Sequence, residues 1–146
     1  MLDKFLIDKH VLLALEEDIG FGDITTDNLA TEDDKLTAKL DTRVDGILCG
    51  TKVFERVFKL LSDDVEIKFN FKDGDRIKAG DVIATLTGSA SAILKGERTA
   101  LNYIQRMSGI ATETRKYQDA IGDNKARISD TRKTTPNFRV FEKYSV

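Results

Sequence analysis

The sequence has very little of three residues that often mark a specialised site. Its 146 residues include one cysteine, one proline and one histidine. A single cysteine, Cys49, excludes both an internal disulfide and a thiolate-rich metal site built from this chain alone, which fits a reducing cytoplasm. The lone histidine, His10, has no second ligand nearby on its helix. We therefore interpret it as structural or solvent-exposed and not as a base or metal ligand.

Long hydrophobic runs are also missing. No run approaches the ~18 apolar residues of a membrane span, and the N-terminal stretch carries acids and lacks a basic n-region, so a signal peptide is not expected. The formal net charge of −2 argues against the uniformly basic surface that nonspecific nucleic-acid binding needs. We expect a cytoplasmic protein that binds neither membrane nor nucleic acid.

What the chain does contain is enough apolar material for a folded core. Hydrophobic residues make up 40% and charged residues 33%, with no low-complexity tract, which is typical of a soluble globular protein. The length fits one domain of ordinary size, or one small domain and the beginning of another.

The first two thirds of the chain alternate between helical and strand patterns. Apolar residues at helical spacing predict a short helix over 9–18, with Asp8 as its N-cap, and a segment dense in Gly, Asp, Thr and Asn predicts a loop over 20–34. Period-two alternation then predicts a small open sheet, covered by a helix. The expected strands are 36–40, 47–49, 65–71 and 82–86, and the expected helix is 51–61.

The last third has a different organisation. A helix is predicted from Ser89 to Ser108, Gly109 interrupts or ends it, and a further helix over 112–121 leads into a short strand at 126–128. A final helical stripe begins at Phe138, and we expect it to bury little. A complete α/β barrel needs roughly 200 residues or more, so a barrel that starts near residue 110 cannot close within these 146.

The most informative segment is DTRKTTP, residues 130–136. It places Arg132 and Lys133 side by side among hydroxyl side chains, just beyond the predicted strand, where α/β barrels hold their ligands. Arginine grips a carboxylate with two parallel hydrogen bonds and lysine adds a compact charge, so the pair suits a substrate with carboxylates or phosphates. Taken alone, however, such a dipeptide is typical of a solvated loop tip.

Other polar residues carry weaker signals. Arg98 and Arg106 lie beside the apolar stripe of one predicted helix, where an arginine usually snorkels or pairs with a neighbour such as Glu97. The residues GFGDITTD could coordinate a cation, but turn formation and capping are their more usual roles. Nothing around Cys49, in a predicted strand, indicates a lowered pKa.

Three segments together resemble one family, in the same order and at suitable spacing. They are LEEDIGFGDITTD, GERTALNYIQRMSGIAT and ARISDTRKTTPNFRVFEKYSV, and they resemble the corresponding stretches of quinolinate phosphoribosyltransferases. The resemblance covers nearly the whole chain. DTRKTTP followed by an aromatic-rich EKY helix is specific to this family and its close paralogues. Arg98, Arg132 and Lys133 are therefore interpreted as functional and not as ordinary surface cations.

The resemblance implies an α+β fold, with an N-terminal open-faced α/β sandwich over residues 1–109 followed by the first unit of an incomplete α/β barrel over 110–146. It implies transfer of a phosphoribosyl group from 5-phosphoribosyl 1-pyrophosphate to quinolinate, giving nicotinate mononucleotide, pyrophosphate and CO2 in NAD synthesis. Mg²⁺ would accompany the pyrophosphate, with its ligands largely outside this chain. The substrate-binding positions would be Arg98, Thr131, Arg132 and Lys133.

In this family the sandwich of one subunit caps the barrel of its partner, so the resemblance also implies a homodimer or higher oligomer in which Arg98 acts across the interface. One departure is Asn137, where the family usually has Gly; asparagine also accepts turn conformations. The later barrel strands, with a His-Arg pair, a further Lys and acidic residues, are absent from these residues. We expect no metal site, no assignable catalytic residue and no measurable turnover from the chain by itself.

Three alternatives remain open. The molybdenum-uptake-associated paralogue shares the fold and parts of the motifs. A carrier module is a second, because residues 73–81 resemble the hairpin of biotinyl and lipoyl domains, although no Met-Lys-Met type of turn is present. The third is a truncated gene product with no activity of its own.

Overall fold

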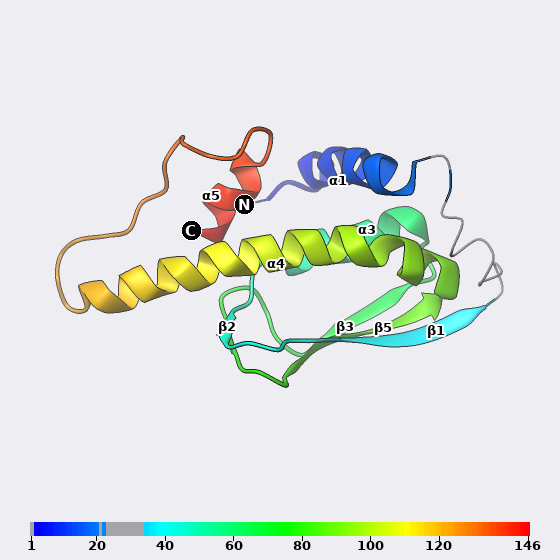
Figure 1. The fold of residues 1–146 in the computed structure, drawn as a ribbon, viewed down its shortest axis with the longest axis horizontal. Coiled ribbons are helices and arrows are strands. Elements are labelled where there is room, and N and C mark those ends of the chain that lie inside the picture. Colours follow the sequence, from blue (N-terminus) through cyan, green and yellow to red (C-terminus); the bar gives the residue numbers. More distant parts are fainter. Residues whose placement is uncertain (1, 21, 23–33) are drawn as a thin grey trace.

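A computed structural model describes residues 2–20, 22 and 34–146 of the chain. Its elements form three layers (Figure 1): a sheet, two helices on one face of that sheet, and two more helices on the far side of the first pair. The middle layer is α3 and α4, and the outer layer is α1 and α5. The bounds of the helices are α1 Lys4–Ile19, α3 Thr51–Leu61, α4 Ala90–Ile121 and α5 Arg139–Ser145.

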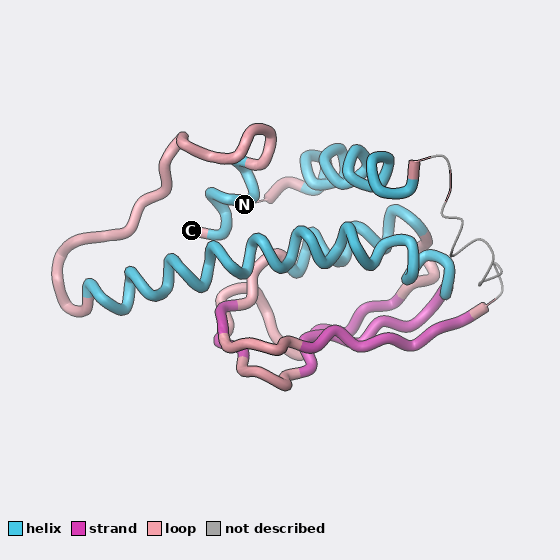
Figure 2. The backbone as a smooth tube through the Cα atoms, viewed as in Figure 1, coloured by secondary structure: helices cyan, strands magenta, loops and turns pink. Residues whose placement is uncertain are grey.

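The sheet is antiparallel and open on one face (Figure 2). Its order is β1-β5-β3, and β2 pairs with β4 in a second, two-stranded sheet. Along β1 the exposed side chains alternate with half-buried ones, so one face is polar and the other packs against the helices. The predicted α+β class with an open-faced sandwich is confirmed. The strands are β1 Lys35–Asp41, β2 Gly46–Ile47, β3 Glu66–Phe69, β4 Arg76–Ile77 and β5 Val82–Ser89.

Helix α3 has the bounds that its apolar spacing predicts. It buries Val53, Phe54, Val57 and Phe58. Its N-cap, Gly50, has no side chain to cap the helix and a φ of 104°, and a Cβ there would lie 2.9 Å from the sulfur of Met107. The carboxylate of Asp73 supplies the missing cap.

The structure corrects the predicted start of the first helix. α1 begins at Lys4, because Asp3 is the N-cap and accepts hydrogen bonds from the backbone N–H groups of Phe5 (3.0 Å) and Leu6 (3.3 Å). Asp8 is not a cap: its carboxylate accepts two hydrogen bonds from Arg56 of α3, at 2.7 and 3.0 Å. Of the loop predicted over 20–34, all but residues 20, 22 and 34 lies outside the described residues.

The prediction that Gly109 interrupts or ends a helix is wrong, because α4 runs through it as one helix of 32 residues. Glycine in a helix costs about 1 kcal/mol relative to alanine. The residues on either side, Met107 and Ala111, are buried in the core, and this packing outweighs the cost. α4 therefore also crosses the predicted domain boundary at 109/110, and the division into 1–109 and 110–146 stays a prediction.

Two further expectations for the end of the chain are wrong. Residues 126–128 form no strand, since no described strand lies beside them to complete a ladder of hydrogen bonds. The last helix, α5, buries more than predicted: Phe141 is fully buried against α1 and α4, and Ser145 is buried as well. Cys49 also lies outside a strand, because β2 ends at Ile47.

The core is continuous from α1 through α3 and α4 to the inner face of the sheet. Of the helices in the described part of the chain, none combines the length and the apolar character needed to cross a membrane.

Candidate anion-binding site

The predicted site segment, residues 130–136, is a loop pinned between α4 and α5. Lys143 of α5 forms an ion pair with Asp130 at the start of the loop. Arg139 of α5 donates to Thr134 Oγ1 (3.1 Å) and to the backbone carbonyl of Arg132 (3.3 Å). These contacts hold the backbone carbonyl of Arg132 and the hydroxyl of Thr134. The loop therefore has a defined shape in which other side chains are available.

The side chains left available are those predicted to bind substrate. Thr131, Arg132 and Lys133 are all exposed. Within the loop, the Lys133 backbone N–H donates to Thr131 Oγ1 at 3.1 Å, which closes a short turn around the two cations. The arrangement presents a guanidinium and an ammonium to solvent from neighbouring positions, where an anion with two acidic groups could meet both.

A side chain from α4 holds the end of the loop. Arg106 of α4 donates from Nη2 to Thr135 Oγ1 (2.5 Å) and to Glu142 Oε1 (2.5 Å). Its guanidinium carbon lies 5.3 Å from the centroid of the Phe138 ring. The hydrogen bond from Arg106 is the main cause of a lowered pKa of the Glu142 carboxyl, which is therefore ionised at neutral pH.

His10 confirms the structural interpretation of the lone histidine. Its Nε2 lies 2.8 Å from the carbonyl oxygen of Asn137, which can only accept, so Nε2 carries the proton. In the neutral ring Nδ1 then accepts from the Tyr103 hydroxyl at 2.5 Å. Burial raises the pKa of Tyr103 to about 12, so that hydroxyl keeps its proton. Asn137 has a φ of 63°, the turn conformation expected where the family usually has Gly.

Asp73 joins α5 to the sandwich. Its Oδ1 accepts from the backbone N–H groups of Gly50 (3.1 Å) and Thr51 (2.9 Å), and this supplies the missing cap of α3. Its Oδ2 accepts from the Tyr144 hydroxyl at 2.9 Å. Desolvation, and then the bond to Asp73, raise the pKa of Tyr144. Burial also raises the pKa of Cys49 to about 11, which agrees with the expectation of an unreactive thiol.

Arg98 lies elsewhere in the single chain. Its Nη1 donates to Asp18 of α1 at 2.8 Å, and the arginine side chain is 74% exposed. Arg106, which contacts the loop, is eight residues further along α4, a rise of about 12 Å. The structure thus brings Thr131, Arg132 and Lys133 together and places Arg98 on another part of the surface, beside α1.

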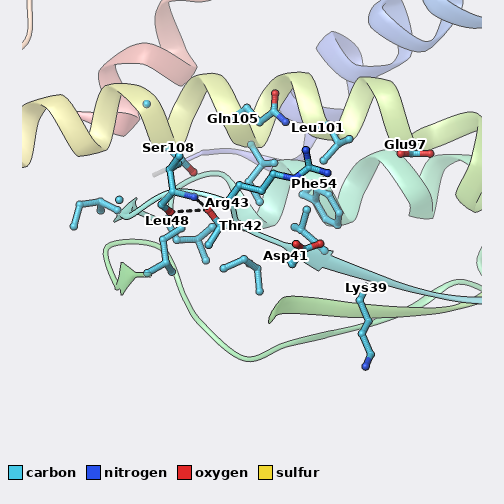
Figure 3. Close-up of a pocket in the computed structure, with 18 of the residues that line it drawn as sticks. Lys39, Asp41, Thr42, Arg43, Leu48, Phe54, Glu97, Leu101, Gln105 and Ser108 are labelled. Atoms are coloured by element: carbon cyan, nitrogen blue, oxygen red, sulfur yellow. Dashed lines mark hydrogen bonds between the residues drawn. The ribbon is translucent and has the colours of Figure 1, made fainter. Parts of the chain in front are cut away.

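A cavity of about 800 Å³ lies between the sheet and α4, but none of the predicted site residues lines it. Its lining includes the apolar side chains of Leu48, Phe54 and Leu101. The side chain of Arg43 lies between the end of β1 and α4 (Figure 3). The charged residues at its rim are of both signs, so the cavity has no evident preference for an anion. The loop after α4, and not this cavity, is the candidate site.

The described residues also offer no resident metal centre. No group of three or more His, Cys, Asp or Glu side chains lies close enough together, within 2–20, 22 and 34–146, to hold an ion. Asp130, the carboxylate next to the exposed cations, is already paired with Lys143. Within the described part of the chain, the residues do not fit a bound magnesium ion.

The fold and the loop define a class: an open-faced α+β sandwich in which the long helix α4 leads to a pinned, cationic loop. Comparison with known families gives this class its name. The family model for the N-terminal domain of quinolinate phosphoribosyl transferase matches residues 23–108, and the model for the C-terminal domain matches residues 110–146. The chain belongs to the quinolinate phosphoribosyltransferase family.

Curated and solved relatives agree. A probable carboxylating nicotinate-nucleotide pyrophosphorylase of Bacillus subtilis is 45% identical over 89% of this chain and 45% of its own length. A decarboxylating quinolinate phosphoribosyltransferase of Nicotiana tabacum is 36% identical over 93% of this chain and 39% of its own length. The crystal structure of NadC from Streptococcus pyogenes superposes with a TM-score of 0.95 at 41% identity, over 99% of this chain and 52% of that one. The chain spans about half the length of these relatives.

Proposed function

We propose that this chain forms the sandwich and the first substrate-binding loop of an enzyme that transfers a phosphoribosyl group from 5-phosphoribosyl 1-pyrophosphate to quinolinate. The products are nicotinate mononucleotide, pyrophosphate and CO2, as a step of NAD synthesis in the cytoplasm. The observation that carries the proposal is the pinned loop: a family member holds Arg132 and Lys133 exposed and adjacent, with Thr131 beside them. We also propose that the barrel begins at residue 110.

The chemistry asks for this kind of site. Quinolinate carries two carboxylates, so it needs cations both to bind and to turn its ring nitrogen toward the ribosyl carbon. As pyrophosphate leaves, positive charge develops at that carbon, and a fixed set of protein charges holds the reactants in line. Mg²⁺ would enter with the pyrophosphate group of the substrate, and its protein ligands would lie largely outside this chain.

We further propose that Arg98 completes the site across a homodimer, with the sandwich of one subunit facing the barrel of the other. Two observations support this. Arg98 is 74% exposed and pairs with Asp18 of α1, and it lies eight residues along α4 from Arg106, which contacts the loop. α1 also exposes a stripe of large apolar side chains opposite its buried face, which is typical of an association surface. The stripe consists of Phe5 (79% exposed), Leu6 (40%), Leu12 (51%) and Leu13 (59%).

The activity test is turnover of quinolinate by the complete gene product, with Arg132→Ala as the variant. Loss of a bidentate contact to a carboxylate is expected to lower kcat/KM by about a hundredfold. Arg127→Ala is the matched control, because Arg127 is also exposed and in the same connecting segment, and its activity should be unchanged. Wild-type protein that forms no nicotinate mononucleotide would refute the proposal. Complementation of a quinolinate-requiring strain separates it from the molybdenum-associated paralogue.

The dimer test mixes two strongly impaired variants, Arg98→Ala and Arg132→Ala. If each site takes Arg98 from one subunit and Arg132 from the other, a mixed dimer contains one intact site, and random 1:1 exchange restores about a quarter of wild-type activity. If both residues act within one chain, mixing restores nothing. The 146-residue chain by itself is expected to show no turnover.

The carrier-module alternative is not favoured. Residues 76–77 of the hairpin-like segment form β4, which pairs with β2 inside the sandwich, and the whole segment lies within the match to the N-terminal domain. A mass spectrum of the purified protein without a biotinyl or lipoyl adduct would agree with this.

A further inference from the structure

We propose that Arg106 is a positioning residue, which sets the shape of the loop that presents Arg132 and Lys133 through its contacts with Thr135 and Glu142. The inference rests on the proposed function of that loop. Arg106 is not itself a substrate contact in this proposal.

One guanidinium joins three parts of the structure. From α4, Arg106 donates to the hydroxyl of Thr135 at the end of the loop and to the carboxylate of Glu142 in α5, both at 2.5 Å. The same group lies over the ring of Phe138, in the turn between the loop and α5. Both hydrogen bonds come from Nη2, while the plane of the guanidinium lies over the Phe138 ring. A lysine ammonium is a point charge on a shorter side chain and could not make all three contacts together.

Glu142 completes the link from the other side. Its Oε1 accepts from Arg106, and its Oε2 accepts from the backbone N–H of Thr135 at 3.3 Å. Thr135 is therefore held through both its side chain and its backbone. The Glu142 side chain is only 15% exposed, so the pair is shielded more than most surface ion pairs.

The clamp acts on the cations through a short path. Thr135 follows Thr134, whose hydroxyl accepts from Arg139, and Arg139 also donates to the carbonyl of Arg132. If Thr135 is released, residues 130–134 keep their contacts with Arg139 and Lys143, which are both on α5. Arg106 joins the loop to α4, while His10 of α1 holds only the carbonyl of Asn137, after the loop.

Arg106 is not part of the apolar core. Its side chain is 48% exposed, and it lies over Phe138, a partly buried ring that packs against the core from outside. Removing the guanidinium should therefore disturb the loop more than the fold. A displacement of about 1 Å in a substrate-positioning group can cost about a hundredfold in rate.

The test is steady-state kinetics on the complete gene product with Arg106→Gln, Arg106→Lys and Thr135→Val. We expect Arg106→Gln to raise the KM for quinolinate by about tenfold or more, with a smaller change in kcat and little change in Tm. Arg106→Lys should not restore the wild-type KM, because an ammonium on a shorter side chain does not contact Thr135, Glu142 and Phe138 together. Thr135→Val keeps the side-chain size and removes the hydroxyl, so it should shift KM in the same direction.

Two comparisons make the result decisive. Arg115→Gln is the matched control, an exposed arginine about two and a half turns further along α4, and it should leave KM unchanged. In a double-mutant cycle, Arg106→Gln should add almost nothing to the loss already caused by Arg132→Ala, because it acts through that residue. A purely structural effect would add in full.

The outcomes separate this inference from the proposed function. Active wild-type protein with a normal quinolinate KM in both Arg106→Gln and Thr135→Val overturns the positioning role and leaves the function intact. So does full additivity with Arg132→Ala, or rescue of KM by Arg106→Lys. If Arg106→Gln does not fold, Thr135→Val and its own cycle with Arg132→Ala decide the question. Inactive wild-type protein overturns both proposals.

Discussion

The sandwich and the segment after α4 are held together by different forces. Between residues 35 and 108 the elements meet through a continuous apolar core of side chains such as Val57 and Phe58. Between residues 122 and 137 the chain has no regular structure, and polar contacts to α4, α5 and His10 hold the loop. A cooperative core fixes a whole domain, whereas a few directional bonds fix a single loop and leave its neighbouring side chains available.

The largest effect should come from the core of the sandwich. Phe58→Ala removes a fully buried ring that packs beside Phe54 and Gly96, and should lower the free energy of unfolding of the purified chain by about 3–5 kcal/mol. Urea unfolding followed by far-UV circular dichroism measures this. Tyr117→Ala, at an exposed ring on α4, should change it by less than about 0.5 kcal/mol. Equal losses in the two variants would show that the buried ring stabilises the sandwich no more than the exposed one.

A smaller and more local effect is expected at α5. Phe141→Ala removes the ring that packs against His10, Tyr103 and Phe138, with ring centroids 4.7, 5.4 and 5.0 Å away. We expect a cost of about 3 kcal/mol, which the chain can avoid in part by releasing α5. Hydrogen exchange should then accelerate in residues 139–145 and stay slow in β5. Uniform acceleration in both would show that α5 and the sandwich unfold as one unit.

A still smaller effect, dependent on pH, is expected where α1 meets α3. The hydrogen bonds from Arg56 hold the pKa of Asp8 below its usual value near 3.8. A lowered pKa in the folded state stabilises the fold above the unfolded value, and the gain is lost as the pH falls through the folded value. Asp8→Asn should therefore cost about 1 kcal/mol near neutral pH and nothing at a pH below the folded pKa.

Urea titrations at several pH values measure this difference. Asp123→Asn, in the exposed turn after α4, is the control and should show no such trend. A cost of Asp8→Asn that stays constant down to strongly acid pH would contradict the assignment of the ion pair.

The smallest effect is expected at Cys49. Because burial raises the pKa of its thiol to about 11, native protein should react with a thiol reagent far more slowly than protein unfolded in guanidinium. Fast labelling under native conditions would show that the segment before α3 opens readily.

The sequence predicted well whatever depends on local apolar periodicity. α3 has its predicted bounds, and β1 extends one residue beyond its prediction at each end, because each packs one regular face against the core. β5 runs three residues past its predicted end, and β3 is shorter than the predicted 65–71. The break at Gly109 and the strand at 126–128 failed for the opposite reason. A helix can keep a glycine when its neighbours are packed, and a strand needs a partner that no local pattern supplies.

Within the candidate site, the sequence indicated the residues that face solvent but not those that hold them. Thr131, Arg132 and Lys133 lie within seven consecutive letters that resemble a family motif. The contacts of Arg106 with Thr135, and of Asp73 with both Thr51 and Tyr144, join residues 22 to 71 positions apart. A single sequence gives no signal for such meetings, because they depend on how the finished helices pack.

Because α4 is uninterrupted, its length sets the distance between the two parts of the chain. Its 32 residues span about 48 Å, and both Arg98 and Arg106 project from it. One residue inserted between them would turn every later position by about 100° and advance it by about 1.5 Å. The number of residues in α4 thus sets the direction in which the cationic loop faces. A change in that number would redirect the loop without altering any residue in it.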